Sequence, residues 1–198
     1  ASAFSGSVTL NGAGGNDTMI GSSGDDQLNG DSGDDRIVQN SDAAQKLSNT
    51  AIEIGTWPAG GGFSATATDG FASIEEVVMT GGASDNVIHA GSYDLGDVTI
   101  DGADGNDTLT GGKRHDSIMG GNGNDKLNAK SGDDVLEGGD GDDTLLGGYG
   151  EDTLIGGPQD DFINANAGHD EIFGGAGNDR VRGDTGDDTI DGGTGTDK

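Results

Sequence analysis

Aliphatic residues recur at every ninth position through the C-terminal half of the chain. From Gly102 onward the sequence divides into ten consecutive nonapeptides, beginning GADGNDTLT, GGKRHDSIM and GGNGNDKLN, and ends in a partial eleventh. Position 8 is aliphatic in all ten complete repeats: Leu109, Ile118, Leu127, Leu136, Leu145, Leu154, Ile163, Ile172, Val181 and Ile190. A fixed period of this kind indicates a repeat architecture in place of an ordinary globular core.

Each nonapeptide predicts a turn followed by a very short strand. Its first six positions are rich in Gly, which adopts turn conformations without steric cost. Its last three read x-aliphatic-x, so one side chain points inward. Two nonapeptides then make one coil, and successive coils stack as parallel strands about 4.8 Å apart. The pattern therefore predicts an all-β fold, a parallel β-roll (a β-solenoid) with two nonapeptides per coil and a thin core of stacked Leu and Ile.

The repeats are not continuous along the chain. A shorter block, GAGGNDTMI, GSSGDDQLN and GDSGDDRIV, lies upstream, whereas the segment between the blocks is richer in Ala, Thr and Ser and holds the only Trp, Trp57. The repeat pattern returns weakly in GGASDNVIH, where Asn86 stands in place of Asp. We predict three parts: a short repeat block at 1–38, degenerate coils carrying an insertion (about 39–73) at 39–101, and a long repeat block at 102–198.

Composition shows that this chain needs an external source of stability. Hydrophobic residues make up 29% and the net charge is −28, from 37 acidic and 9 basic residues. Low hydrophobicity with high net charge is typical of disordered chains. Nucleic acid is a poor partner, because phosphate binding requires a basic surface. The absence of Cys excludes disulfides, and no apolar run of 18 residues is present to span a membrane.

Position 6 of the repeat is Asp throughout both blocks, and its carboxylates are the candidate metal ligands. Stacked coils place these carboxylates in rows, where they repel one another unless a cation lies between them. Calcium takes six to eight oxygen ligands from carboxylates and backbone carbonyls, whereas magnesium needs a tighter cage and transition metals prefer Cys or His. His89, His115 and His169 are scattered and are interpreted as turn residues. The fourteen candidate ligands, together with turn carbonyls, are Asp17, Asp26, Asp35, Asp107, Asp116, Asp125, Asp134, Asp143, Asp152, Asp161, Asp170, Asp179, Asp188 and Asp197.

The thirteen complete nonapeptides resemble GGxGxDxUx, with U a large aliphatic residue, the repeat of the RTX (repeats-in-toxin) family. The resemblance implies a right-handed parallel β-roll with calcium between neighbouring turns of the same edge, so that each repeat pairs with the second one after it. In the long block, one edge would carry six of the aspartates from Asp107 to Asp197 and the other five from Asp116 to Asp188. These edges have five and four gaps, so the long block would bind at most about nine calcium ions. In the short block Asp17 would pair with Asp35.

The sites are not expected to be equal. Lys113 and Arg114 occupy the turn that ends at Asp116, and we expect the gap between Asp116 and Asp134 to bind calcium weakly because cations would lie in it. Ala129 and Lys130 lie in the turn on its other side. Pro158 and Gln159 replace the usual turn residues before Asp161, so calcium binding in the two gaps beside Asp161 is also expected to be weak.

Function follows from the coupling of metal binding to folding. The resemblance to RTX proteins implies export through a type I secretion apparatus, then folding on calcium outside the cell or at the bacterial cell surface. The chain would be part of a larger secreted protein that it stabilises. The lack of a signal peptide in residues 1–10 agrees with the type I route. It contains neither H-E-x-x-H nor G-x-S-x-G, so we expect no enzymatic activity. The alternative is an adhesive or carbohydrate-binding module of a secreted adhesin or polysaccharide-modifying enzyme, with the insertion contacting the surface or sugar ligand.

Overall fold

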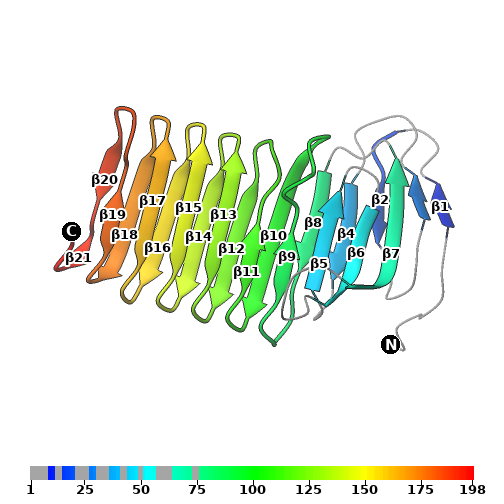
Figure 1. The fold of residues 1–198 in the computed structure, drawn as a ribbon, viewed down its shortest axis with the longest axis horizontal. Helices are drawn as coiled ribbons and strands as arrows, with labels where there is room; N and C mark the ends of the chain where they lie inside the picture. The colour runs from blue at the N-terminus through cyan, green and yellow to red at the C-terminus, as the bar shows by residue number, and fades with distance from the viewer. Residues whose placement is uncertain are drawn as a thin grey trace.

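The computed structural model is built from β-strands (Figure 1). It describes residues 9–11, 15–20, 27–29, 36–40, 44–48, 51–56, 64–72 and 76–198. Trp57, Asp26 and Asp35 lie outside these ranges. No helix is present in the described parts of the chain, and none of them could therefore cross a membrane as a helix.

The strands form two sheets, which we call sheet A and sheet B. Sheet A contains, in chain order, β1 (Thr9–Asn11), β3 (Gln27–Asn29), β5 (Ala44–Ser48), β6 (Ala51–Thr56), β7 (Ser64–Ala72), β9 (Val87–His89), β11 (Thr108–Thr110), β13 (Lys126–Ser131), β15 (Thr144–Tyr149), β17 (Phe162–Ala167) and β19 (Arg180–Arg182). Sheet B contains β2 (Thr18–Ile20), β4 (Arg36–Asn40), β8 (Glu76–Thr80), β10 (Asp97–Asp104), β12 (Ser117–Asn122), β14 (Val135–Asp140), β16 (Thr153–Pro158), β18 (Glu171–Gly177), β20 (Thr189–Asp191) and β21 (Thr194–Gly195).

The chain alternates between the sheets, and equivalent positions two repeats apart pair in parallel. Leu109 of β11 pairs with Leu127 of β13, and Ile118 of β12 pairs with Leu136 of β14. Each coil of the long block therefore holds two nonapeptides, and the coils follow one another in a row from β10 to β20 (Figure 1). The predicted all-β parallel β-roll is confirmed.

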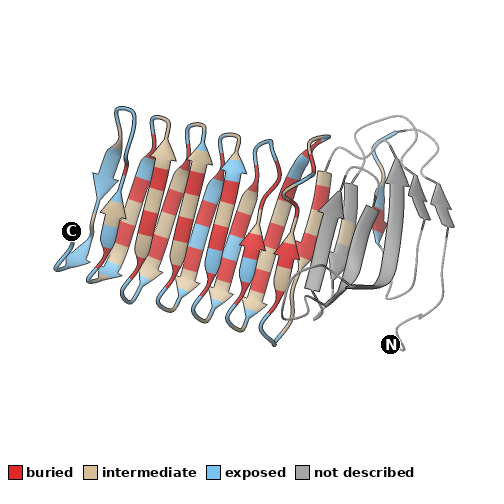
Figure 2. Ribbon diagram, viewed as in Figure 1, coloured by how far each residue is buried: buried red, intermediate tan, exposed pale blue. Residues whose placement is uncertain are grey.

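The core is a narrow double row between the sheets, visible as the buried bands that cross successive strands in Figure 2. Side chains at position 8, such as Leu136, Leu145 and Leu154, have no exposed surface. Position 1 of the following repeat is also buried, including Ala129 and Ala165. Because alternate residues of a strand face the same side, positions 8 and 1 both point inward.

The strands are longer than the sequence predicted. Those from β12 to β17 contain six residues, as in Lys126–Ser131, in place of the predicted three. Each runs from position 7 of one repeat to position 3 of the next, because small residues at position 1 continue the parallel ladder into what we expected to be turn. The turn proper is reduced to positions 4 to 6.

The segment between the two repeat blocks interrupts the parallel stack. Strand β6 pairs antiparallel with both β5 and β7, and these three strands enter sheet A between β3 and β9. On the other sheet β4 pairs directly with β8, so that Arg36 is opposite Glu76. The predicted boundary between residues 101 and 102 falls inside β10, and the three-part division of the chain stays a prediction.

Glycine at position 4 suits the close stacking of the turns, and Gly141 shows why. Gly141 has φ of +138°, and a Cβ added there would collide with the carbonyl oxygen of Gly123 in the preceding turn. Both the left-handed backbone and the collision disfavour any other residue.

We expect Gly141→Ala to lower the free energy of unfolding by at least about 2 kcal/mol, from backbone strain and overpacking together. Urea unfolding in saturating calcium would measure the loss. Gly91→Ala is the matched control, because Gly91 lacks a left-handed φ and its nearest neighbour is the movable His89 ring at 3.1 Å. Equal effects of the two substitutions would contradict this account of the turn.

Candidate metal centre in the turns

The two sheets bring the position-6 aspartates to the two edges of the roll. Asp107, Asp125, Asp143, Asp161, Asp179 and Asp197 follow turns that lead from sheet B to sheet A, which we call edge 1. Asp116, Asp134, Asp152, Asp170 and Asp188 follow the turns from sheet A to sheet B, which we call edge 2. The nine from Asp107 to Asp179 are only 1–3% exposed. The structure thus places the predicted residues in the two predicted rows.

One oxygen of each carboxylate links neighbouring coils. The backbone N–H of Asp125 donates to Oδ1 of Asp143 over 2.8 Å, and that of Asp143 donates to Oδ1 of Asp161 over 2.8 Å. The same bond recurs along both edges at 2.7–3.1 Å, always between residues 18 apart. The repeat pattern did not predict this bond, which makes every position-6 carboxylate a structural link as well as a candidate ligand.

The second carboxylate oxygen is buried without a donor. Among the described residues, Oδ2 accepts no hydrogen bond in Asp125, Asp134, Asp143, Asp152, Asp161, Asp170 and Asp179. Burying an acceptor without a partner costs about 1–3 kcal/mol, and more when it is charged. A row of such atoms indicates that something other than the protein's own N–H groups satisfies them.

Backbone carbonyls gather beside these oxygens. A Cβ placed on Gly138 would meet both Oδ2 of Asp143 and, at 2.6 Å, the carbonyl oxygen of Gly156, which lies in β16 of the next coil. Gly120 and Gly156 have the same two kinds of neighbour. Glycine at position 1 therefore leaves room for a carboxylate oxygen and a peptide oxygen to approach one another.

Burial makes these carboxyl groups hard to ionise. Loss of hydration raises the pKa of Asp125, Asp134, Asp152 and Asp161 to about 7. The hydrogen bond from the backbone N–H of the preceding coil lowers the pKa, but its effect is smaller. Neighbouring carboxylates of the same edge raise the pKa further. The pKa of Asp116 is raised to about 6, again chiefly by burial. A cation among the oxygens would favour the ionised form.

The donor set suits a hard cation. No group of three or more His, Cys, Asp or Glu side chains comes together in the described ranges, so a metal ion would need carbonyl oxygens besides carboxylates. Calcium accepts such a mixture of carboxylate and carbonyl oxygens, in flexible geometry. The orphaned Oδ2 atoms and the adjacent carbonyls fit that ion.

Comparison with known families agrees with this geometry. The model of the RTX calcium-binding nonapeptide repeat matches residues 8–38 and a series of overlapping segments that together span 80–198. The chain belongs to the RTX family. No curated protein matches it. RTX repeats bind calcium, the ion that the oxygen donors of these turns suit.

One RTX turn departs from the pattern in a way that corrects a prediction. Lys113 pairs with Asp94 at 3.3 Å, and Arg114 Nε donates to the Asp94 carbonyl over 3.0 Å. Both cations therefore reach back to the turn before theirs and not into the gap toward Asp134. The cations are therefore not where the sequence predicted them, whereas the weak calcium binding predicted for the gap between Asp116 and Asp134 stays a prediction. Oδ2 of Asp116 accepts from the Gly112 N–H over 2.5 Å.

The turn with Pro158 and Gln159 keeps the shape of its neighbours. Gln159 also has a positive φ, of +77°, although it differs from the +119° to +151° of glycines at this position, such as Gly105 and Gly177. Its side-chain Oε1 accepts from the Gly141 N–H over 3.2 Å, and Oδ2 of Asp161 is one of the oxygens without a donor. The weak binding predicted for its two gaps stays a prediction.

Position 5 forms a second ladder that the sequence analysis missed. Backbone N–H groups donate to the position-5 side chain of the preceding coil, as from Asp142 to Asn124 over 3.1 Å. His115 and His169 take part through Nδ1, each accepting over 3.0 Å. These two histidines are therefore turn residues, as predicted, whereas the prediction is wrong for His89, which is the last residue of strand β9. The signal was present, because every position 5 from Asn106 to Asp187 is Asn, Asp, Glu or His.

The remaining candidates are less enclosed. Asp188 and Asp17 are half-buried and Asp197 is exposed. Asp26 and Asp35 are outside the described residues, so the pairing of Asp17 with Asp35 stays a prediction.

Asp143→Asn separates the two roles of the carboxylate. An amide oxygen can still accept from the Asp125 N–H, but the amide NH2 replaces an oxygen ligand by a donor. We expect the loss of one or two calcium ions and a higher calcium concentration for half-maximal folding, measured by calorimetry and circular dichroism. Asp140→Asn removes the same charge from an exposed position, and a shift as large as that of Asp143→Asn would show that net charge alone governs binding.

Acid should stabilise the metal-free roll. Because the folded pKa values of Asp125, Asp134, Asp152 and Asp161 are raised to about 7, the protonated groups favour folding at low pH, and this contribution is lost as pH rises through about 7. We expect metal-free protein to gain β signal in circular dichroism between about pH 8 and about pH 5.5. In saturating calcium the signal should change little over that range, and a metal-free signal that falls on acidification would contradict the assignment.

Proposed function

We propose that this chain is a calcium-dependent folding module of a larger secreted protein. The observation that carries the proposal is the row of buried carboxylate oxygens without donors along each edge of the roll. Burial of these oxygen atoms as unpaired anions costs free energy, and a divalent cation shared between neighbouring carboxylates would offset that cost.

Calcium supplies the stability that the core lacks. In the long block the apolar core consists of positions 8 and 1, and position 1 is Gly or Ala throughout. A net charge of −28 opposes compaction of the metal-free chain. Binding of about nine divalent ions would cancel more than half of that charge, so metal binding and folding occur together.

This coupling suits a protein that must remain unfolded before export. Calcium is scarce in the bacterial cytosol and abundant outside, so the chain would pass through a type I secretion channel unfolded and fold on arrival. The folded roll then acts as a rigid, acidic module that stabilises the attached protein outside the cell or at its surface. Its role in this proposal is structural and not enzymatic, in keeping with the RTX repeat as a calcium-binding structural repeat.

A calcium titration followed by far-UV circular dichroism tests the proposal, with magnesium as the control ion and calorimetry to count bound ions. We expect a cooperative gain of β signal with calcium, no gain with magnesium at the same concentration, and up to about nine ions in the long block. A full β spectrum in excess chelator, unchanged by calcium, would overturn the proposal because the roll would then be folded without metal.

A further inference from the structure

Charge is divided between the two sheets of the roll. From β9 to β19, the strands of sheet A contain four basic residues and no acidic one: Lys126, Lys130, Arg180 and Arg182. From β8 to β20, the strands of sheet B contain no basic residue and eight acidic ones: Glu76, Asp97, Asp101, Asp104, Glu137, Asp140, Glu171 and Asp191. The strands from β9 to β19 therefore give the outer face of sheet A a basic surface, although the chain as a whole has a net charge of −28.

The basic side chains form two groups on that face. Lys126 and Lys130 lie on β13, whereas Arg180 and Arg182 lie on β19, and all four are exposed. Register places Lys126, Thr144, Phe162 and Arg180 in one row across four neighbouring strands. The two groups are thus three strand spacings apart, about 14 Å. A small anion cannot contact both groups, but an extended polymer lying along the roll can.

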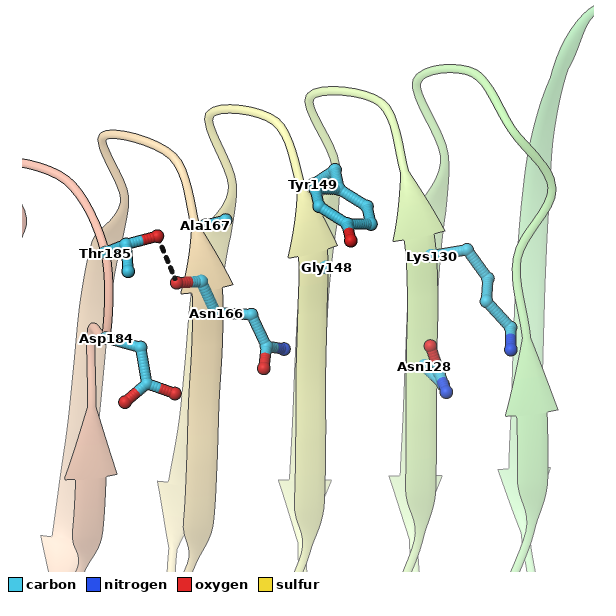
Figure 3. Close-up of a pocket in the computed structure, with 8 residues that line it drawn as sticks. All are labelled: Asn128, Lys130, Gly148, Tyr149, Asn166, Ala167, Asp184 and Thr185. Atoms are coloured by element: carbon cyan, nitrogen blue, oxygen red, sulfur yellow. Dashed lines mark hydrogen bonds between the residues drawn. The ribbon is translucent and has the colours of Figure 1, made fainter.

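A shallow hollow of about 550 Å³ lies between the groups, over β13, β15 and β17 (Figure 3). Gly148, which has no side chain, leaves the hollow open, and Asn128, Lys130, Tyr149 and Asn166 surround it. Asp184 and Thr185 lie at its C-terminal end, where the Thr185 hydroxyl donates to the Asn166 carbonyl over 3.3 Å. The lining therefore offers amide, hydroxyl and carboxylate groups beside a cation.

Aromatic side chains accompany these polar groups. Tyr149 is 73% exposed at the rim of the hollow. Phe162, in the strand between the two basic groups, has the Arg180 guanidinium 5.5 Å from its ring centroid. A large exposed aromatic ring with a polar tip is typical of a contact surface.

We infer that the outer face of sheet A binds an extended, carboxylated polysaccharide lying along the axis of the roll. Lys and Arg pair with the carboxylates of the sugars. The amides of Asn128 and Asn166 and the carboxylate of Asp184 donate to and accept from hydroxyl groups, and Tyr149 packs against a sugar ring. This surface belongs to the regular coils and does not require the inserted strands.

Two other polyanions suit the face less well. Nucleic acid carries a phosphate on every nucleotide and would meet Asp184 inside the hollow, whereas a sugar hydroxyl can donate to that carboxylate. A second copy of this chain offers its acidic sheet B, but the net charge of −28 opposes its approach. Charge complementarity together with the hydroxyl-binding groups therefore favours the polysaccharide.

The test is binding of a short galacturonate oligomer to the full chain in saturating calcium, by calorimetry. We expect binding that weakens with salt, and none of the same oligomer after methyl esterification of its carboxylates. Lys126→Gln with Lys130→Gln should weaken binding about tenfold, since two charge-assisted contacts are lost. Tyr149→Ala should weaken it as well. Lys113→Gln is the control with the same kind of charge change, because Lys113 lies in a turn and pairs with Asp94.

Three results would overturn the inference: no binding by a folded roll, equal binding of the esterified oligomer, or tighter binding of a single-stranded DNA oligonucleotide. A loss of affinity with Lys113→Gln half as large as that of the double variant, on a logarithmic scale, would do so too, because the loss would then follow net charge alone. The inference relies on the proposed function only for calcium to keep the roll folded. Circular dichroism of the same samples separates the two, since a chain unfolded in calcium contradicts the proposed function and a folded chain that does not bind contradicts this inference.

Discussion

The position-6 carboxylate governs this structure, because its two oxygens have opposite requirements. Oδ1 accepts the N–H of the preceding coil and so sets the stacking of the turns. That bond fixes the carboxylate in a buried position, where Oδ2 has no donor in seven of the described aspartates. The link between coils therefore favours a cation beside Oδ2, so one carboxylate serves both the stacking of the turns and the candidate metal site.

The periodicity of the sequence predicts the coil and both rows of aspartates, because one coil repeats with little variation. Leu109 over Leu127 follows directly from a period of nine read two repeats at a time. The direction of individual side chains was not predictable in this way. Lys113 and Arg114 reach Asp94 and not the next turn, and that choice depends on a degenerate turn whose length departs from the repeat.

Strand length was underestimated for a related reason. Glycine at position 1 indicates a turn in most proteins, but here position 1 lies inside a strand because its small residue, Gly or Ala, continues the parallel ladder. The same residue type serves another purpose at position 4, where Gly141 has a left-handed backbone. Composition alone does not distinguish the two uses, and only the stacked coils reveal them.

Stacking also determines where the sequence is able to vary. Positions 1, 4, 6 and 8 are constrained by the core, the turns and the metal sites, whereas positions 7 and 9 face outward on both sheets. Since successive nonapeptides alternate between the sheets, odd and even repeats supply different faces, and each face can acquire its own charge. Basic strands in sheet A and acidic strands in sheet B are the result. The roll thus keeps its acidic edges for calcium while one broad face becomes complementary to an anionic polymer.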